Sequence, residues 1–215
     1  MNIVISGTSS GIGKATALLF LSRGHFVYGI DIKDSTIKNE NYKHFICDIR
    51  SKNLPKISDI DIIIANAGVQ DESLAIDVNL IGTINFVNEY KQSKNLKSIL
   101  FVISASARNG AEFPMYSASK GGLVSFMKNM ALNLSGKGIT VNSVSPGGVI
   151  TPLNEHIIDN KDLYNKVLNE TLLNKWADSE EIAEWIYFIT VINKSMTGED
   201  ILIDNGEMLK SNFIW

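Results

Sequence analysis

The chain has 215 residues, of which 45% are hydrophobic and 20% are charged, and this composition predicts a single globular domain over residues 1–215. The formal charge of −3 is spread along the sequence, and no apolar run approaches the roughly 20 residues of a membrane span, which argues against nucleic-acid binding and membrane insertion. The single cysteine, Cys47, excludes an internal disulfide framework, and an N-terminus without a signal-peptide pattern favours a cytoplasmic location.

The chain begins with a predicted strand, a glycine-rich turn and a helix. The strand covers Ile3–Ser6, the turn covers Gly7–Gly13, and the helix covers Lys14–Arg23 and stops at Gly24. Glycine lets the backbone approach a phosphate closely, and the helix N-terminus offers N–H donors and a positive dipole end. The spacing is GxxxGxG rather than the common GxGxxG, but the strand–turn–helix context favours a dinucleotide phosphate site.

A second predicted strand, Phe26–Ile30, ends at Asp31. An acid about 20 residues beyond the glycine turn can accept hydrogen bonds from both ribose hydroxyls of an adenosine, and it would repel a 2′-phosphate. Asp31 therefore predicts NAD in preference to NADP, with a capping or loop aspartate as the alternative. Lys33 is close enough in sequence to offset that repulsion.

Five further strands are predicted, namely His44–Cys47, Asp61–Ala65, Ser98–Ser104, Ile139–Val144 and Ile201–Ile203. The first two are continuous apolar runs, as expected of parallel strands covered on both faces. The connections on either side of the first of these are short, with about a dozen residues each, so they have room for only a turn or two of helix.

Long helices are predicted over residues 71–94 and 116–135, and another begins with Asp178 as N-cap and Glu181 at N3. Asn79, inside the first of these, stands among apolar neighbours. Because Asn is mildly unfavourable within a helix, this placement indicates a buried and hydrogen-bonded amide.

Tyr116 and Lys120 are four residues apart, so in a helix their side chains lie on one face, one turn apart. A phenol has a free pKa of roughly 10, and a neighbouring ammonium lowers it by favouring the phenolate. Such a pair can give a proton to a developing alkoxide or take one from an alcohol. YxxxK alone is more typical of a surface Tyr beside a surface Lys, so its meaning depends on the accompanying motifs.

In this order and register, the motifs resemble those of the short-chain dehydrogenase/reductase family over essentially the whole chain. The matching segments are Ser6-Gly7-x-x-x-Gly11-Ile12-Gly13, Ala65-Asn66-Ala67-Gly68, Asn79, Tyr116-Ser117-Ala118-Ser119-Lys120, Pro146-Gly147, Thr151 and Asp204-Asn205-Gly206. The resemblance implies an α/β fold of the Rossmann type, with a doubly wound, seven-stranded parallel sheet and helices on both faces. It also implies NAD or NADP as cofactor and reversible hydride transfer between an alcohol and a ketone.

The resemblance further implies roles for individual residues. Tyr116 is the proton donor or acceptor, Lys120 binds the nicotinamide ribose and lowers the Tyr pKa, Ser104 bonds the substrate oxygen, and Asn79 holds a water in a proton relay. The implied partners are a small-molecule substrate and a second copy of the chain, in a homodimer or homotetramer paired through the two long helices. The cofactor-binding residues implied are Gly7, Ser9, Ser10, Gly11, Ile12, Gly13, Asp31, Asp48, Ile49, Asn66, Ala67, Gly68, Tyr116, Lys120, Pro146, Gly147, Val149 and Thr151.

Departures from the family pattern leave alternatives open. Ser106 rivals Ser104 as the catalytic serine, because the spacing to Tyr116 is shorter than in the family. The shortened loop before Asn79 predicts a pocket that is open on that side, and residues 153–176 fit either a mobile lid or a packed helix. The alternative function is an NAD(H)-binding sensor or scaffold without turnover. The three histidines show no metal-site spacing, and an epimerase is disfavoured because no substrate-domain insertion is visible.

Overall fold

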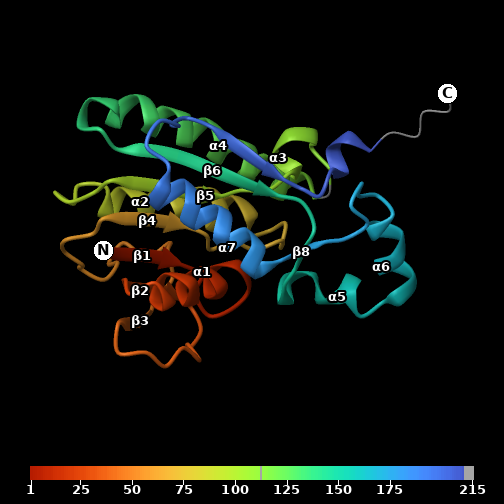
Figure 1. Cartoon of the computed structure of the whole chain (residues 1–215), viewed down its shortest axis with the longest axis horizontal. Coiled ribbons are helices and arrows are strands. Elements are labelled where there is room, and N and C mark those ends of the chain that lie inside the picture. Colours follow the sequence, from red (N-terminus) through yellow and green to blue (C-terminus); the bar gives the residue numbers. More distant parts are fainter. Residues whose placement is uncertain (112, 211–215) are drawn as a thin grey trace.

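A computed structural model describes residues 1–111 and 113–210 and has a parallel sheet between two layers of helices (Figure 1). The sheet contains seven strands in the order β3-β2-β1-β4-β5-β6-β9, which confirms the predicted doubly wound fold. Its strands are β1 (Asn2–Ser6), β2 (Phe26–Asp31), β3 (Tyr42–Ile46), β4 (Ile62–Ala65), β5 (Ser98–Val102), β6 (Thr140–Pro146) and β9 (Asp200–Ile203).

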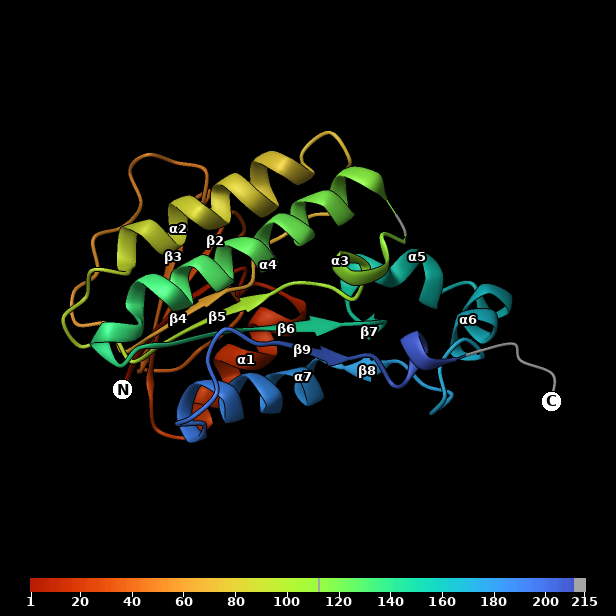
Figure 2. The same cartoon turned by 90° about the horizontal axis from the view of Figure 1, so that it is seen from above.

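Helices cover both faces of the sheet (Figure 2). On one face α1 (Gly11–Ser22) and α7 (Ser179–Tyr187) bury a cluster around Phe20 and Ile182. On the other face α2 (Thr83–Tyr90) and α4 (Pro114–Leu134) bury a cluster around Phe86 and Met127. The central strands β1, β4, β5 and β6 are almost fully buried, whereas β3 and β9 at the two edges of the sheet are only partly buried.

Shorter elements complete the chain. They are the π-helical segments η1 (Ile76–Gly82) and η4 (Phe188–Ile192), the 3₁₀ turns η2 (Ser135–Lys137), η3 (Pro152–Asn154) and η5 (Glu207–Leu209), the helices α3 (Ser106–Asn109), α5 (Glu155–Ile158) and α6 (Lys161–Leu168), and the paired strands β7 (Val149–Ile150) and β8 (Ala177–Asp178). The capping box of Asp178 and Glu181 at the start of α7 is present as predicted.

Several predicted boundaries are wrong. The first helix begins at Gly11, inside the glycine turn, and the helix predicted from residue 71 begins only at Ile76. The third strand begins at Tyr42, and neither connection beside it, 32–41 or 47–61, contains a helix. Instead, Leu54 and Ile60 of the second connection are buried in the core beside α2 and α4. This loop therefore covers part of the sheet without forming a helix.

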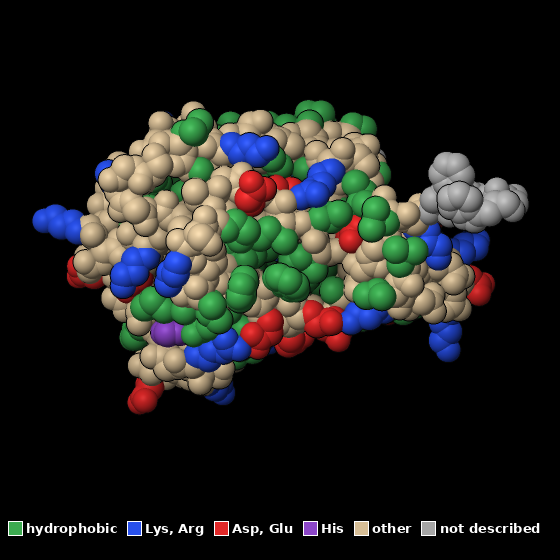
Figure 3. Space-filling model, turned by 45° about the horizontal axis from the view of Figure 1, so that its top comes forward, with side chains coloured by type: hydrophobic (Ala, Val, Ile, Leu, Met, Phe, Trp, Pro, Cys, Tyr) green, Lys and Arg blue, Asp and Glu red, His purple; other side chains and the backbone are tan. Residues whose placement is uncertain are grey.

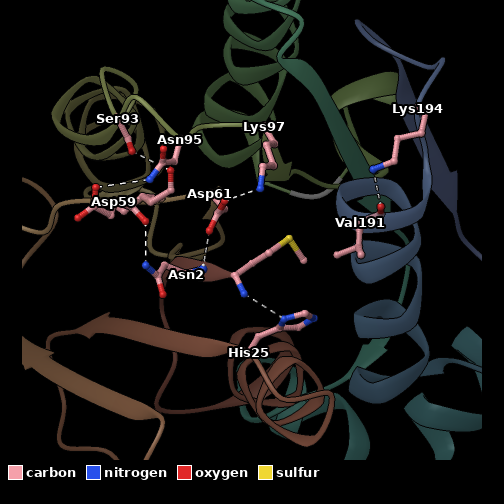
Figure 4. Close-up of polar contacts among 11 residues, drawn as sticks. Asn2, His25, Asp59, Asp61, Ser93, Asn95, Lys97, Val191 and Lys194 are labelled. Atoms are coloured by element: carbon pink, nitrogen blue, oxygen red, sulfur yellow. Dashed lines mark hydrogen bonds and ion pairs between the residues drawn. The ribbon is translucent and has the colours of Figure 1, made fainter.

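The two ends of the strands differ in character. At the amino ends, loops are tied together by local polar contacts (Figure 4). The carboxylate of Asp61 accepts hydrogen bonds from the Asn2 backbone N–H (2.8 Å) and from Lys97 (2.7 Å). At the carboxyl ends, strand order reverses between β1 and β4, and the crossovers diverge to opposite faces. In doubly wound sheets, ligands bind in the crevice at that reversal.

Candidate active site

A cavity of about 830 Å³ lies at the carboxyl ends of the strands, beside the reversal between β1 and β4. Most residues predicted from the sequence line it, namely Gly7, Ser10, Gly11, Ile12, Asp31, Asp48, Ile49, Asn66, Ala67, Gly68, Ser104, Tyr116, Lys120, Pro146, Gly147, Val149 and Thr151. The remaining three, Ser9, Gly13 and Asn79, contact residues of the lining through the interactions described below. The fold therefore gathers the predicted residues in one place.

The glycine turn leads directly into the N-terminus of α1. A Cβ on Gly13 would lie only 2.0 Å from the carbonyl oxygen of Gly7, so the turn can close this tightly only with glycine there. Ser10 is the N-cap of α1, yet no side chain caps the helix and its first turn contains no acid. Uncapped N–H groups at a positive dipole end, facing a cavity, fit the pyrophosphate of a dinucleotide.

Asp31 is held at the cavity wall by two backbone donors. Its carboxylate accepts hydrogen bonds from the N–H groups of Ser9 and Lys33, both at 3.0 Å. The Lys33 carbonyl is itself fixed by the Ser9 hydroxyl (3.0 Å) and by His44 Nε2 (2.9 Å). The loop after β2 is thus tied to the glycine turn and to β3, and this fixes the Asp31 carboxylate at the cavity wall.

Asn66 and Ser6 join β1 to β4 at the reversal. The Asn66 amide donates to the carbonyls of Ser6 (3.0 Å) and Gly7 (3.1 Å), and the Ser6 hydroxyl accepts from the N–H groups of Asn66 and Ala67. On the β3 side, Asp48 forms an ion pair with Arg50 at 2.6 Å, and the guanidinium lowers the pKa of the Asp48 carboxyl.

Tyr116 and Lys120 lie on the buried face of the first turns of α4, with only 8% and 4% of their surface exposed. The Lys120 ammonium lies 5.6 Å from the centroid of the Tyr116 ring and donates to the carbonyl of Val102 at 3.1 Å. Burial lowers the pKa of Lys120 to about 8. The surface reading of this pair is therefore wrong, because both side chains line the cavity.

Asn79 is fully buried in η1. Its Oδ1 accepts from the Val69 N–H at 2.8 Å, while its Nδ2 donates to the Val69 carbonyl at 2.9 Å and to the Ser119 hydroxyl at 3.1 Å. The predicted buried, hydrogen-bonded amide is confirmed. It connects the loop after β4 to the helix that carries Tyr116, and π-helical segments such as η1 are frequent at functional sites.

Ser104 and Ser106 both line the cavity just beyond β5. The Ser106 hydroxyl donates to Ser104 Oγ at 3.0 Å, and the Ser106 backbone N–H donates to the same oxygen at 3.2 Å. With two donors directed at its oxygen, the Ser104 hydroxyl is left to donate its own proton elsewhere. The two hydroxyls therefore differ in their hydrogen bonding, with Ser106 as the donor and Ser104 as the acceptor.

Residues 152–176 pack as a wall of the cavity. Trp176 lies flat against Gly148, where a Cβ would come within 2.1 Å of its indole nitrogen, and Tyr164 meets its ring edge-on at 5.7 Å between centroids. From the opposite loop, Gln70 donates to Asn154 at 3.2 Å. The shortened loop therefore contacts this segment, and its residues Val69, Gln70 and Leu74 also line the cavity.

Some residues of the site carry no motif in the sequence. Gln70, Asn154, Trp176 and Glu207 line the cavity, and burial together with nearby Asp204 raises the pKa of the Glu207 carboxyl. Glu207 follows the Asp204-Asn205-Gly206 motif directly, so its closeness to that motif was the one available signal. Within residues 1–111 and 113–210, no group of three His, Cys, Asp or Glu side chains could hold a metal ion, and no helix is long and apolar enough to cross a membrane.

Comparison with known proteins places the chain in a family. Residues 7–207 match a family model described as enoyl-(acyl carrier protein) reductase. The chain is 31% identical to a 3-oxoacyl-[acyl-carrier-protein] reductase of Thermotoga maritima, over 94% of this chain and 96% of that protein. A short chain dehydrogenase family protein from Francisella tularensis superposes with a TM-score of 0.84 at 29% identity, covering 97% of this chain and 99% of that one.

A solved structure of 4-hydroxyisoleucine dehydrogenase in complex with NADH gives a TM-score of 0.85 at 28% identity and covers 98% of this chain and 99% of that one. The matches extend over nearly the full length of the chain and agree with the strand order and the motifs. The chain belongs to the short-chain dehydrogenase/reductase family of oxidoreductases.

Proposed function

We propose that the protein is an NAD(H)-dependent oxidoreductase that interconverts an alcohol and a ketone, with the whole chain acting as one cofactor-binding and catalytic domain. The observation that carries this proposal is that Tyr116, Lys120 and Ser104 share one cavity with the uncapped N-terminus of α1 and with Asp31. Proton-transfer groups and dinucleotide-binding groups are both needed for this reaction, and a protein that only binds the cofactor has no chemical need for the former.

In this proposal the cavity holds the cofactor along the carboxyl ends of the strands. The N-terminus of α1 binds the pyrophosphate, and the Asp31 carboxylate accepts hydrogen bonds from the hydroxyls of the adenosine ribose. Asp48 and Asn66 border the adenosine. Lys120 binds the nicotinamide ribose, and Pro146 and Gly147 border the nicotinamide. Bound NADH supplies the hydride, and the protein supplies position, electrostatics and a proton.

The proton comes from Tyr116 in the reducing direction. The substrate oxygen lies between the Tyr116 phenol and the Ser104 hydroxyl, which the two bonds from Ser106 leave free to donate. The nearby Lys120 ammonium stabilises the phenolate that remains. In this proposal Asn79 supports a water relay to solvent through the Val69 backbone, which its amide orders and which borders the cavity.

The substrate proposed is a small-molecule alcohol or ketone. The names of the relatives point to 3-oxoacyl thioesters and to hydroxy amino acids as classes to test first. An NADH-oxidation screen over ketones, steroids, sugars, acyl thioesters and oxidised amino acids tests the proposal. Turnover with one class defines the reaction, and NADH binding without turnover on any class would favour the sensor or scaffold alternative.

The cofactor preference is the first prediction. A 2′-phosphate would lie within a few ångströms of the Asp31 carboxylate, where like charges at about 4 Å cost on the order of 1 to 4 kcal/mol. We expect NADH to be preferred over NADPH by at least about tenfold in kcat/KM, which corresponds to roughly 1.4 kcal/mol. Replacing Asp31 by Ser should reduce that preference, mainly by raising kcat/KM for NADPH.

Asp34→Ser is the matched control, because Asp34 is an exposed acid of the same loop. It should leave the preference within about twofold of the wild type. Equal kcat/KM for NADH and NADPH in the unmodified protein would show that Asp31 does not discriminate between the 2′-hydroxyl and the 2′-phosphate.

The second prediction is a homodimer or homotetramer. Ile81 on η1 and Leu132 on α4 are 53% and 76% exposed, so the helix pair proposed as an interface presents apolar side chains to solvent. Trp185, Phe188 and Ile192 of α7 and η4, on the other face of the sheet, are also exposed. Hydrophobic side chains also gather at the centre of the face that Figure 3 shows. Light scattering should give a multiple of the 23.7 kDa chain mass at micromolar concentration, whereas a monomer would contradict the prediction.

A further inference from the structure

The helix that carries Tyr116 is capped by a residue from a distant part of the chain. Two N–H groups in the first turn of α4, those of Met115 and Tyr116, donate to the two carboxylate oxygens of Glu72 at 3.0 and 3.2 Å. Glu72 lies on the shortened loop between β4 and η1. Local capping is lacking, because the N-cap residue Phe113 offers no side-chain acceptor and the first turn contains no acid. The carboxylate therefore satisfies donors that helix N-termini leave unpaired.

The backbone of Tyr116 is bonded on both sides, directly to Glu72 and through Ser119 to Asn79 of η1. Its N–H donates to Glu72, and its carbonyl accepts from the Ser119 hydroxyl at 2.6 Å. Ser119 in turn accepts from the amide of Asn79, which lies a few residues after Glu72. One short segment of chain, which begins at the edge of the proposed cofactor site, thus fixes the peptide groups before and after the phenol.

We propose that Glu72 is a positioning residue for Tyr116. By capping the first turn of α4, its carboxylate fixes the position of the phenol relative to Ser104 and Lys120. This inference rests on the proposed function of Tyr116. It also explains how a shortened loop serves this site, because the loop is anchored to the catalytic helix at Glu72 and to η3 through Gln70. Without the carboxylate, the first turn of α4 loses its two anchors, and the phenol moves away from the substrate oxygen while the cofactor contacts on β1, β2 and β4 stay in place.

The test compares Glu72→Ala and Glu72→Gln with Asp71→Ala in the full-length protein. Asp71 is the neighbouring acid on the same loop, and its carboxylate accepts hydrogen bonds from the backbone N–H and the hydroxyl of Ser73, within the loop. Because a displacement of about 1 Å can cost roughly 100-fold in rate, we expect Glu72→Ala to lower kcat by about 10- to 100-fold. The Kd for NADH, measured by fluorescence titration, should stay within about twofold. Glu72→Gln keeps one acceptor and should fall between wild type and Glu72→Ala, and Asp71→Ala should match the wild type.

Combination with Tyr116→Phe separates this inference from the proposed function. In the Tyr116→Phe background, Glu72→Ala should lower the residual rate by less than about twofold, since the group it positions is gone. If Tyr116→Phe is inactive but Glu72→Ala retains the wild-type kcat, the positioning role fails and the proposed function stands. Equal loss of kcat in Glu72→Ala and Asp71→Ala would also overturn the role. If Glu72→Ala does not fold, a wild-type kcat in Glu72→Gln overturns it, and a reduced kcat with unchanged NADH binding supports it.

Discussion

Replacing Tyr116 by Phe is expected to lower kcat by about 10³-fold while the Kd for NADH changes by less than about twofold. The substitution removes one oxygen and its proton but keeps the ring, which is buried on α4 beside Lys120. A positioned general acid contributes roughly 10² to 10⁴ in rate, and no other acid on the cavity wall is paired with a buried ammonium in the described structure. Steady-state NADH oxidation and a fluorescence titration of NADH measure the two quantities.

Tyr90→Phe is the control for loss of a buried phenol. The Tyr90 hydroxyl donates to the Pro55 carbonyl at 2.8 Å, away from the cavity lining, so this variant should lose stability and keep its kcat. Retention of most of the wild-type kcat by Tyr116→Phe would remove Tyr116 from the mechanism.

Replacing Lys120 by Met should separate catalysis from stability. The ammonium is proposed to bind the nicotinamide ribose and to stabilise the phenolate, so its removal should raise the Kd for NADH about tenfold and lower kcat at least about 100-fold. Met has a similar length and no charge, so packing against the Tyr116 ring is kept. NADH titration and steady-state kinetics read these effects.

In contrast to its effect on catalysis, Lys120→Met should raise the free energy of unfolding of the cofactor-free protein at neutral pH. Burial lowers the pKa of Lys120 from 10.5 to about 8, so the folded state binds this proton more weakly than the unfolded state does. The penalty is fully present below pH 8, on the order of 3 kcal/mol, and it disappears as the pH rises from 8 through 10.5. Loss of the hydrogen bond to Val102 offsets about 1 kcal/mol of the gain in Lys120→Met.

Denaturant unfolding at several pH values measures this effect. Lys120→Met should exceed the wild type in free energy of unfolding at pH 7, and the gain should vanish towards pH 10.5. Lys128→Met places the same substitution at an exposed position of the same helix and should show no such pH dependence. A Lys120→Met variant that is equally destabilised at pH 7 and at high pH would contradict the buried-charge account, and an unchanged Kd for NADH would contradict the ribose contact.

The sheet and most of the site could be predicted because their signals are local. Buried parallel strands need continuous apolar runs, a phosphate turn needs glycines at close approaches such as Gly13, and Tyr116 and Lys120 need helical spacing. Asn79 stood out since an amide among apolar neighbours must find hydrogen-bond partners when it is buried. Each of these residues lies in a segment whose conformation can be predicted from the sequence of that segment alone.

The parts that could not be predicted depend on partners far along the chain. β3 begins at Tyr42, two residues before its predicted start, and the Tyr42 hydroxyl bonds to Thr8 at 2.9 Å and to His44 at 3.0 Å. Glu72 resembled an ordinary first-turn acid of a helix, whereas that helix begins later and the carboxylate caps α4 instead. Ser104 and Ser106 differ only in which of them donates to the other.

The central claim is that this chain transfers a hydride rather than merely binding the dinucleotide. The most direct test incubates the wild-type protein with a ketone from the screen and NADH that carries deuterium at both hydrogen positions of nicotinamide C4. It measures NADH consumption and analyses the product by mass spectrometry. We predict one alcohol formed per NADH consumed, with one deuterium on the former carbonyl carbon, and loss of both signals in Tyr116→Phe. Tight NADH binding with no labelled alcohol from any ketone class would contradict the claim.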